Sequence, residues 1–274
     1  YKLWIMLIAL FGEKSVPGRD SFYTLLRRHG LMLPPRKPRS TTNSNHRYHK
    51  WKNRIKNLVL NSANQLWVSD ITYIPLRGGD VCYLHLITDA YSHKIVGWKL
   101  ADTLRASATM TALRQAIKQA IEMTGNEKFP GLIHHSDRGC QYASREYVNM
   151  LREHGIQVSM TESGDPKDNA QAERINNTMK NELLKGKVFR NINEVVAAVA
   201  RAVDFYNNER PHMSINMMTP AQAASCQGEI SKRWSSFRTK AIKNRQECSD
   251  IGEDGLSLPS VHGVLSGLRP PRTP

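Results

Sequence analysis

Residues 65–101 read QLWVSDITYIPLRGGDVCYLHLITDAYSHKIVGWKLA and contain the clearest strand signals of the chain. Three runs rich in β-branched and aromatic residues are separated by RGGD at 77–80 and YSH at 91–93, which are typical turn sequences. We therefore predict three strands joined as an antiparallel meander. Asp70 lies inside the first strand, on the same face as the apolar residues two and four positions away, because side chains alternate along a strand.

Helices and further strands follow the meander. Residues 106–125, ASATMTALRQAIKQAIEMTG, carry apolar side chains at helical spacing and end at Gly125. Residues 131–141, GLIHHSDRGCQ, begin as an apolar strand at 131–133 and then turn polar. The next predicted elements are a helix at 144–154, a strand at 156–160 and helices at about 168–184 and 192–207. This order predicts an α/β fold with a ribonuclease H-like mixed five-stranded sheet and helices on both faces.

The net charge of +15, from 39 Lys and Arg against 24 Asp and Glu, indicates a polyanionic partner. From Ser21 to Ser69 there is no acidic residue, although ten Lys and Arg lie in that segment. Such a segment suits DNA phosphates, with Arg47, Lys50 and Lys52 as candidate contacts. A solvated basic linker is the alternative.

Three parts of the chain follow from these patterns. Residues 1–60 are predicted to form an N-terminal helical and basic DNA-binding arm, residues 61–225 the α/β core, and residues 226–274 a basic helix followed by a disordered tail. The apolar start, YKLWIMLIALFG, is shorter than the ~18 residues that span a bilayer, so we expect no membrane span. It also lacks a convincing signal-peptide cleavage pattern, so we expect a helix whose beginning lies outside the sequence. The four cysteines form no C-x-x-C pair, which argues against a zinc ribbon or disulfide framework and fits a cytoplasmic protein.

Three carboxylates stand out by their positions, namely Asp70 on the first strand, Asp137 at the end of the fourth, and Glu173 on the helix after the fifth. Singly, each has an ordinary explanation as an edge or turn residue or as part of a solvated helix face. Together, three hard oxygen donors can hold two Mg²⁺ ions ~3.5–4 Å apart for phosphoryl displacement. Asp89 is the alternative first ligand, although DAYSH reads as a turn and ranks below Asp70. No Ser-His-Asp order, P-loop or G-x-G-x-x-G offers another mechanism.

With these acids in place, and 35 residues between Asp137 and Glu173, the chain resembles the DDE transposases and retroviral-type integrases. More narrowly, it is similar to the OrfB-type transposases of the insertion-sequence-three family. The resemblance covers roughly residues 60–225. Its motifs are LWVSDITYI, YLHLITDAYSHKIVGW, HHSDRGCQYAS, SMTESGDPKDNAQAERINNTMKNELL and YNNERPHMSINMMTPAQA.

The resemblance implies an integrase catalytic core in which the three acids bind two Mg²⁺ or Mn²⁺ ions. It implies cleavage of a phosphodiester at an element end and transfer of the freed 3′-hydroxyl to another strand. The implied partners are the terminal inverted repeats and target DNA. Lys180 matches a basic residue that would contact terminal DNA phosphates. Further candidate DNA contacts are Arg138, Asn169 and Arg174.

Arg174 is a departure, because the family glutamate is commonly followed by a small residue; we expect it to alter only nearby DNA contacts. His134 and His135 flank Asp137 and either orient it or simply pack. No zinc is predicted. The family implies a homo-oligomer on DNA, fusion to an upstream helix-turn-helix reading frame, and a bacterial cytoplasmic protein that joins the nucleoid when bound. The alternatives are a hydrolytic nuclease of the same fold and a non-catalytic DNA-binding remnant.

Overall fold

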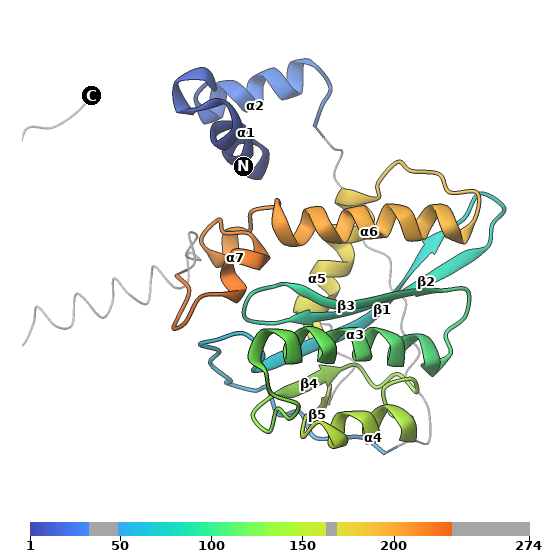
Figure 1. Ribbon diagram of the computed structural model, residues 1–274. Coiled ribbons are helices and arrows are strands. Elements are labelled where there is room, and N and C mark those ends of the chain that lie inside the picture. The colour runs from blue at the N-terminus through green and yellow to red at the C-terminus, as the bar shows by residue number, and fades with distance from the viewer. Residues whose placement is uncertain (33–48, 163–168, 232–274) are drawn as a thin grey trace, which may run out of the picture. The chain divides into compact units, whose positions relative to one another are not determined.

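A mixed five-stranded sheet is the centre of the structure (Figure 1), a computed structural model that describes residues 1–32, 49–162 and 169–231. The strands are β1 (Leu66–Pro75), β2 (Val81–Asp89), β3 (Ile95–Ala101), β4 (Ile133–Ser136) and β5 (Gln157–Met160). They lie in the order β3-β2-β1-β4-β5. β1, β2 and β3 pair antiparallel, whereas β4 pairs parallel with β1, and β5 parallel with β4. The predicted meander and mixed sheet are confirmed. All of these strands belong to the first of the two units into which the chain divides, Tyr1–Arg233.

The turns of the meander are fixed by local hydrogen bonds. In the first turn, the Leu76 N–H donates to the Asp80 carbonyl at 2.8 Å, and Gly79 takes the left-handed backbone with φ 93°. In the second, the buried Asp89 carboxylate accepts from the Ser92 N–H at 2.8 Å and the Ser92 hydroxyl at 2.6 Å. Its other oxygen accepts from the Asn64 N–H at 2.8 Å. Asp89 therefore has the turn role that its sequence context indicates.

Helices account for about half of the remaining described residues. The α-helices are α1 (Lys2–Phe11), α2 (Arg19–Arg28), α3 (Ala106–Thr124), α4 (Arg145–Glu153), α5 (Ala170–Thr178), α6 (Ile192–Asn208) and α7 (Pro220–Ala224). Shorter turns are η1 (Glu13–Ser15), η3 (Met179–Leu183) and η4 (Met213–Ile215). The single helix predicted at about 168–184 is instead α5 followed by η3, which is a π-helical turn. Periodicity cannot reveal this change, because apolar residues on either side of a π-turn still face the sheet.

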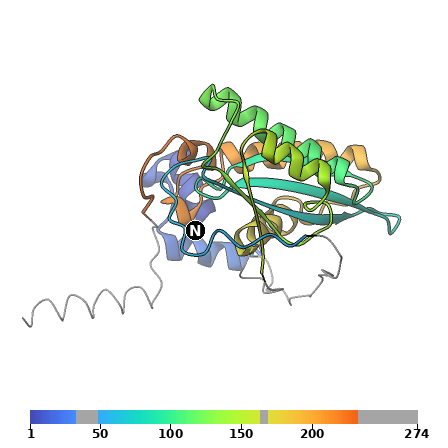
Figure 2. The same ribbon diagram turned by 90° about the horizontal axis from the view of Figure 1, so that it is seen from below.

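Each face of the sheet has its own apolar core. Along β1, Trp67 packs with α3 and α4, whereas Val68 and Ile74 pack toward α5 and α6, as strand alternation requires. Figure 2 shows α3 and α4 on one side of the sheet and α5 on the other. α3 comes very close to β3, since a Cβ added at Gly97 would lie 2.1 Å from the Ala112 carbonyl oxygen. Glycine is therefore required at this contact.

β4 differs from its sequence prediction. The apolar residues at 131–133 were expected to form the strand, but β4 runs from Ile133 to Ser136 and contains both histidines, which are buried. The ring Nε2 of His134 is 2.9 Å from the Tyr147 hydroxyl, and Nδ1 of His135 is 2.8 Å from the Ser159 hydroxyl. Buried polar side chains are tolerated when they find such partners. Asp137 therefore directly follows the strand, as predicted, although the strand begins two residues later than expected.

Some predicted features lie outside the described residues. These are the basic residues between 33 and 48, including Arg47, and the basic helix and tail predicted after residue 231. Among the helices that the structure does describe, none combines the length and the hydropathy needed to cross a membrane.

Candidate active site

Asp70 and Asp137 lie at neighbouring positions on two parallel strands. β1 and β4 pair in a register that places Ser69 opposite Ser136, and each carboxylate is the next residue along its chain. Because the two strands run in the same direction, both side chains lie at the same end of the β1–β4 pair. The predicted convergence of the strand acids follows from this register.

The Asp70 carboxylate is held by two donors. One oxygen accepts from the Ile71 N–H at 2.8 Å, and the other accepts from the side-chain amide of Asn176, on α5, at 2.8 Å. Burial, and then the nearby negative charge of Asp137, raise the pKa of Asp70 to about 7. The charge of Glu173 adds a smaller upward effect. A bound cation would neutralise this repulsion and so stabilise the ionised form of Asp70.

Asp137 is half-buried in a tight turn that follows β4. Its Oδ1 accepts from the Gly139 N–H at 2.9 Å, and a Cβ at Gly139 would lie 2.9 Å from that same oxygen. Beneath the two acids lies the buried ring of Tyr142, whose hydroxyl oxygen is 3.0 Å from the Ser69 hydroxyl. Burial, together with the charges of Asp137 and Asp70, raises the pKa of Tyr142 well above its usual value, so its hydroxyl stays neutral.

Glu173 lies on α5, whose first two turns are held against the sheet. The Asn169 amide donates to the Ser69 carbonyl at 3.1 Å, and Ala172 and Ile175 are buried against the sheet. Glu173 is itself exposed and lies one helical turn before Asn176, the residue that contacts Asp70. The helix therefore turns Glu173 toward the same end of the sheet.

The three acids are within electrostatic reach of one another but are not gathered into a coordination shell. Among residues 1–32, 49–162 and 169–231, no three His, Cys, Asp or Glu side chains are close enough to form a metal site. The donor set nevertheless fits a hard divalent cation, since it consists of carboxylates. In addition, the buried Oδ1 atoms of Asn169 and Asn176 have no hydrogen-bond partner. Unpaired oxygen atoms beside repelling carboxylates are favourable surroundings for a cation.

The predicted DNA-contact residues have varied surroundings. Lys180 lies in η3 with its Nζ 4.0 Å from the centre of the Tyr73 ring. Arg138 is directed at the end of β5, where Nε donates to the Thr161 carbonyl at 2.7 Å and Nη2 donates to the Glu162 carbonyl. Asn169 is buried. The exposed members of the set are Arg174, Lys50 and Lys52.

Two neighbours of the acids were not assigned a role from the sequence. Asn176 belongs to the polar side of the predicted helix, together with Asn169, Glu173 and Lys180, so its position was a usable signal. Tyr142 gave no such signal, because its contact with Ser69 depends on how the turn after β4 folds back. Both histidines are buried, and His134 hydrogen-bonds with Tyr147 on α4 while His135 hydrogen-bonds with Ser159 on β5.

Known proteins match the part of the chain that carries this site. Two models of the Integrase core domain match residues 61–166 and 154–220. A putative transposase of the insertion sequence IS986/IS6110 from Mycobacterium tuberculosis is 40% identical over 162 residues, which is 59% of this chain and 58% of that protein. The match thus spans less than two thirds of this relative. An uncharacterized 31 kDa protein of insertion element IS600 from Shigella sonnei is 34% identical over 210 residues, covering 75% of this chain and 74% of that protein.

The fold also has a solved counterpart. The cryo-electron microscopy structure of the simian T-cell lymphotropic virus intasome in complex with PP2A regulatory subunit B56 gamma contains a similar chain. The TM-score is 0.50 with 18% sequence identity, over 71% of this chain and 65% of that one. This similarity supports the ribonuclease H-like fold.

Proposed function

The chain belongs to the integrase-core transposases of insertion sequences, and from that premise we propose that it cleaves DNA at element ends and joins the freed 3′-hydroxyl groups to target DNA. The observation that carries this proposal is the placement of Asp70 and Asp137 on neighbouring parallel strands, with the charge of Glu173 reaching Asp70. Acids without a partnered nucleophile suit phosphoryl transfer to water or to a DNA hydroxyl.

Asp70, Asp137 and Glu173 would hold two Mg²⁺ or Mn²⁺ ions, and no zinc is involved. Bound ions would supply Lewis-acid stabilisation of the attacking and leaving oxygens of the phosphodiester. The preference for these metals rests on the carboxylate donors, because Mg²⁺ and Mn²⁺ favour oxygen ligands. The inward movement of Glu173 that this requires is compatible with its exposed position on α5.

The protein prepares the acids for this role. The Asn176 amide and the Ile71 N–H each hold one oxygen of Asp70 and so fix the orientation of the carboxylate. With its pKa raised to about 7, the metal-free side chain keeps its proton through much of the acidic range and releases it near neutrality. Tyr142 contributes no charge, because its pKa lies well above the usual range.

DNA is the partner, in the form of the terminal inverted repeats and target DNA, bound by a homo-oligomer. Lys180 and Arg174 contact phosphates near the cleaved bond, and Asn169 and Arg138 act close to the DNA by holding the backbone at Ser69 and Glu162. A helix-turn-helix from an upstream reading frame recognises the element ends. The protein acts in the bacterial cytoplasm and is associated with the nucleoid when bound.

The test is an assay on labelled oligonucleotides that carry an element end, with Mg²⁺. Strand joining gives a product longer than either substrate, which a purely hydrolytic nuclease cannot make. Asp70→Asn, Asp137→Asn and Glu173→Gln should each abolish cleavage and joining while leaving DNA binding intact. Glu146→Gln, at an exposed position on α4, is the matched control and should keep wild-type activity. Activity that survives in any of the three acid variants would overturn the assignment.

A further inference from the structure

The segment before the core alternates in exposure with a two-residue period. Residues 50–56 read KWKNRIK, and the four basic side chains Lys50, Lys52, Arg54 and Lys56 are exposed, whereas the residues between them are partly buried. This period is typical of extended backbone, in which successive side chains point to opposite sides. One side of the segment is therefore basic, and the other faces the protein.

The inward side of the segment is seated on the core. Trp51 packs against the apolar cluster of α3 and α4 and lies under the Arg152 guanidinium, 5.3 Å from the ring centre. Ile55 packs on the opposite cluster beside Leu66 and Val68. Through Trp51 and Ile55, the segment 50–56 contacts apolar clusters on both faces of the sheet, and these contacts fix its course.

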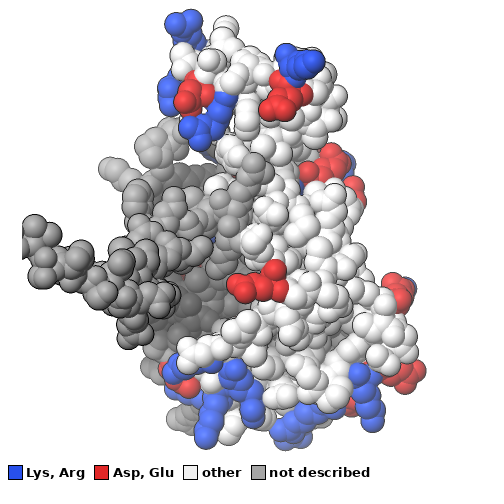
Figure 3. Space-filling model, turned by 90° about the vertical axis from the view of Figure 1, so that its left-hand side faces the viewer, with Lys and Arg blue, Asp and Glu red and all other residues white. Residues whose placement is uncertain are grey.

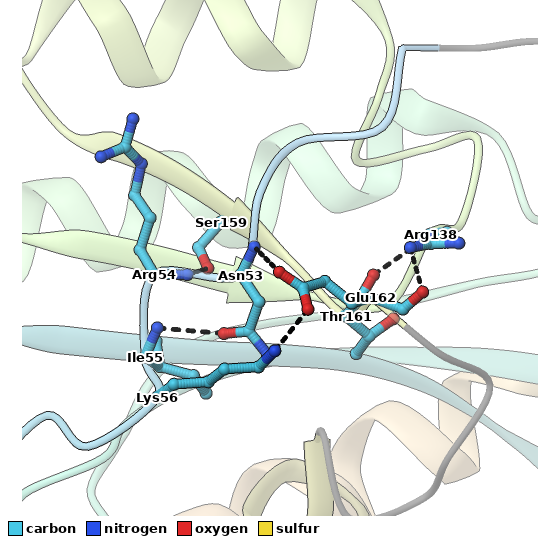
Figure 4. A network of polar contacts seen from close by, with 8 residues as sticks. All are labelled: Asn53, Arg54, Ile55, Lys56, Arg138, Ser159, Thr161 and Glu162. Carbon is cyan, nitrogen blue, oxygen red and sulfur yellow. Dashed lines mark hydrogen bonds and ion pairs between the residues drawn. The ribbon is translucent and has the colours of Figure 1, made fainter.

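Backbone hydrogen bonds fasten the same segment to the end of β5 (Figure 4). The Arg54 N–H donates to the Ser159 hydroxyl at 2.9 Å, and the Asn53 N–H donates to a Glu162 carboxylate oxygen at 3.4 Å. The Arg54 side chain points away from this network, while Lys56 forms an ion pair with Glu162. In the view of Figure 3, Lys and Arg side chains lie along the lower edge of the molecule, with acidic side chains among them, and further Lys and Arg lie at its upper end.

The segment that carries the basic side is connected by contacts to the turn after β4 in the candidate active site. Arg138, the residue after Asp137, donates to the carbonyl of Glu162, whose carboxylate in turn holds Asn53 and Lys56. One chain of contacts therefore runs from the turn that bears Asp137 to the basic segment. In extended backbone, side chains two residues apart on one side lie ~6.6 Å apart, so Lys50, Lys52 and Arg54 form a row of three cations ~13 Å long.

We propose that Lys50, Lys52 and Arg54 form a phosphate-binding row, called here the basic row, which grips the DNA backbone beside the scissile bond. This inference rests on the proposed function for its partner, DNA, and adds the surface that holds it. The grip is independent of sequence, because the row offers cationic side chains and no shape that could read bases. Seating on β5 and the two apolar clusters fixes the row in place before DNA arrives, which lowers the ordering cost of binding.

The test measures how DNA affinity depends on salt for the wild type and for a variant with all three row residues changed to Ala. Each phosphate contact contributes a slope of about −0.9 in log K against log salt. Removing three contacts should make the slope shallower by about 2.7, so that the loss of affinity between 50 and 200 mM salt shrinks by about 40-fold. The matched control changes Arg114, Lys118 and Lys128 to Ala, which removes the same charge at exposed positions elsewhere. An unchanged slope in the row variant, or an equal change in the control, would overturn the proposal.

A second variant separates the effect of Trp51 packing from the effect of the three cationic side chains. Trp51→Ala keeps all three cations, so its slope should stay within 0.5 of wild type, while affinity falls at every salt concentration. If Trp51→Ala gives a salt slope as shallow as that of the row variant, the three cations alone do not define the contact with DNA phosphates. Thermal unfolding of each variant checks that the core is folded.

Cleavage distinguishes failure of this inference from failure of the proposed function. The row variant should need more DNA than the wild type to reach half of its maximal cleavage rate, because the row holds DNA, whereas the Arg114, Lys118 and Lys128 control should not. An unchanged DNA requirement in the row variant would contradict that role. If the wild type neither cleaves nor joins DNA in Mg²⁺, the proposed function fails, whereas the salt slopes still decide whether the row binds DNA.

Discussion

The two halves of the sheet are built in different ways. β1, β2 and β3 contain 10, 9 and 7 residues and bury mostly apolar side chains, whereas β4 and β5 contain 4 residues each. The short pair buries His134, His135, Ser136 and Ser159. Apolar area therefore stabilises the antiparallel half, while hydrogen bonds between buried polar groups hold the parallel half that ends at Asp137. The half that positions the acid is fixed by directional contacts, and the other half supplies bulk stability.

The largest effect is expected in the antiparallel half. Leu84 on β2 is fully buried against α6, and Leu84→Ala should lower the free energy of unfolding by about 3 kcal/mol, because it leaves a cavity. Urea unfolding at neutral pH measures this change. Val188→Ala, at a position 71% exposed, is the control and should stay within about 0.5 kcal/mol. A loss below about 1 kcal/mol for Leu84→Ala would mean that apolar packing is not what stabilises this half.

The parallel half should be the more acid-sensitive of the two. Burial lowers the pKa of His134 to about 3, so below about pH 6.5 the unfolded chain takes up a proton that the folded protein does not. The stability that neutral His134 contributes is complete above pH 6.5 and is lost as the pH falls, by about 3 kcal/mol at pH 4. His134→Gln should remove that part of the decline, as measured by urea unfolding from pH 7 to pH 4.

His85 on β2 is the matched comparison for that experiment. Its pKa is lowered to about 4, a smaller shift than that of His134, and burial is again the largest cause. His85→Gln should therefore flatten the pH dependence less than His134→Gln does. Equal effects would remove the distinction in acid sensitivity between the two halves.

The smallest effect concerns the hydrogen bond from Asn176 on α5 to Asp70 on β1. Asn176→Ala removes a donor to Asp70 and should lower the rate of Mg²⁺-dependent cleavage about 10-fold, as loss of a group that orients a metal ligand typically does. Stability should change by less than about 1 kcal/mol, because the same substitution also removes an unpaired buried oxygen. Asn177→Ala, at the exposed neighbouring position, should leave cleavage within twofold. A wild-type rate in Asn176→Ala would show that Ile71 alone orients the carboxylate.

The sequence predicted the antiparallel half well, because its signals are local. Long β-branched runs, the turn at RGGD and the turn acid Asp89 each act within a few residues. The start of β4 was placed two residues too early, and the partners of its buried histidines, Tyr147 and Ser159, are 13 and 24 positions away along the chain. Burial of a polar side chain depends on such distant partners and leaves no local pattern.

For the candidate site, the sequence singled out three acids as candidates but did not predict how they are held. Period-two alternation placed Asp70 on the same face as Val68 and Ile74, and in the structure that face carries the contact with Asn176. Three features depend on tertiary packing and could not be predicted. They are the π-helical turn that contains Lys180, the Tyr73 ring beside Lys180, and the direction of the Arg138 side chain toward Thr161. The alternating exposure of residues 50–56 was likewise beyond reach, because it required knowing that Trp51 and Ile55 rest on two different cores.

The central position of β1 also has a consequence for how the chain folds. Its pairing with β2 needs only a short turn, but its other edge pairs Ser69 with Ser136, 67 positions later. Until the helix between them has formed and β4 has docked, that apolar edge is open to strands of other molecules, which is a route to aggregation. Slow closure of this long loop should therefore limit the yield of soluble protein on refolding, and dilution or low temperature should favour the native sheet over intermolecular pairing.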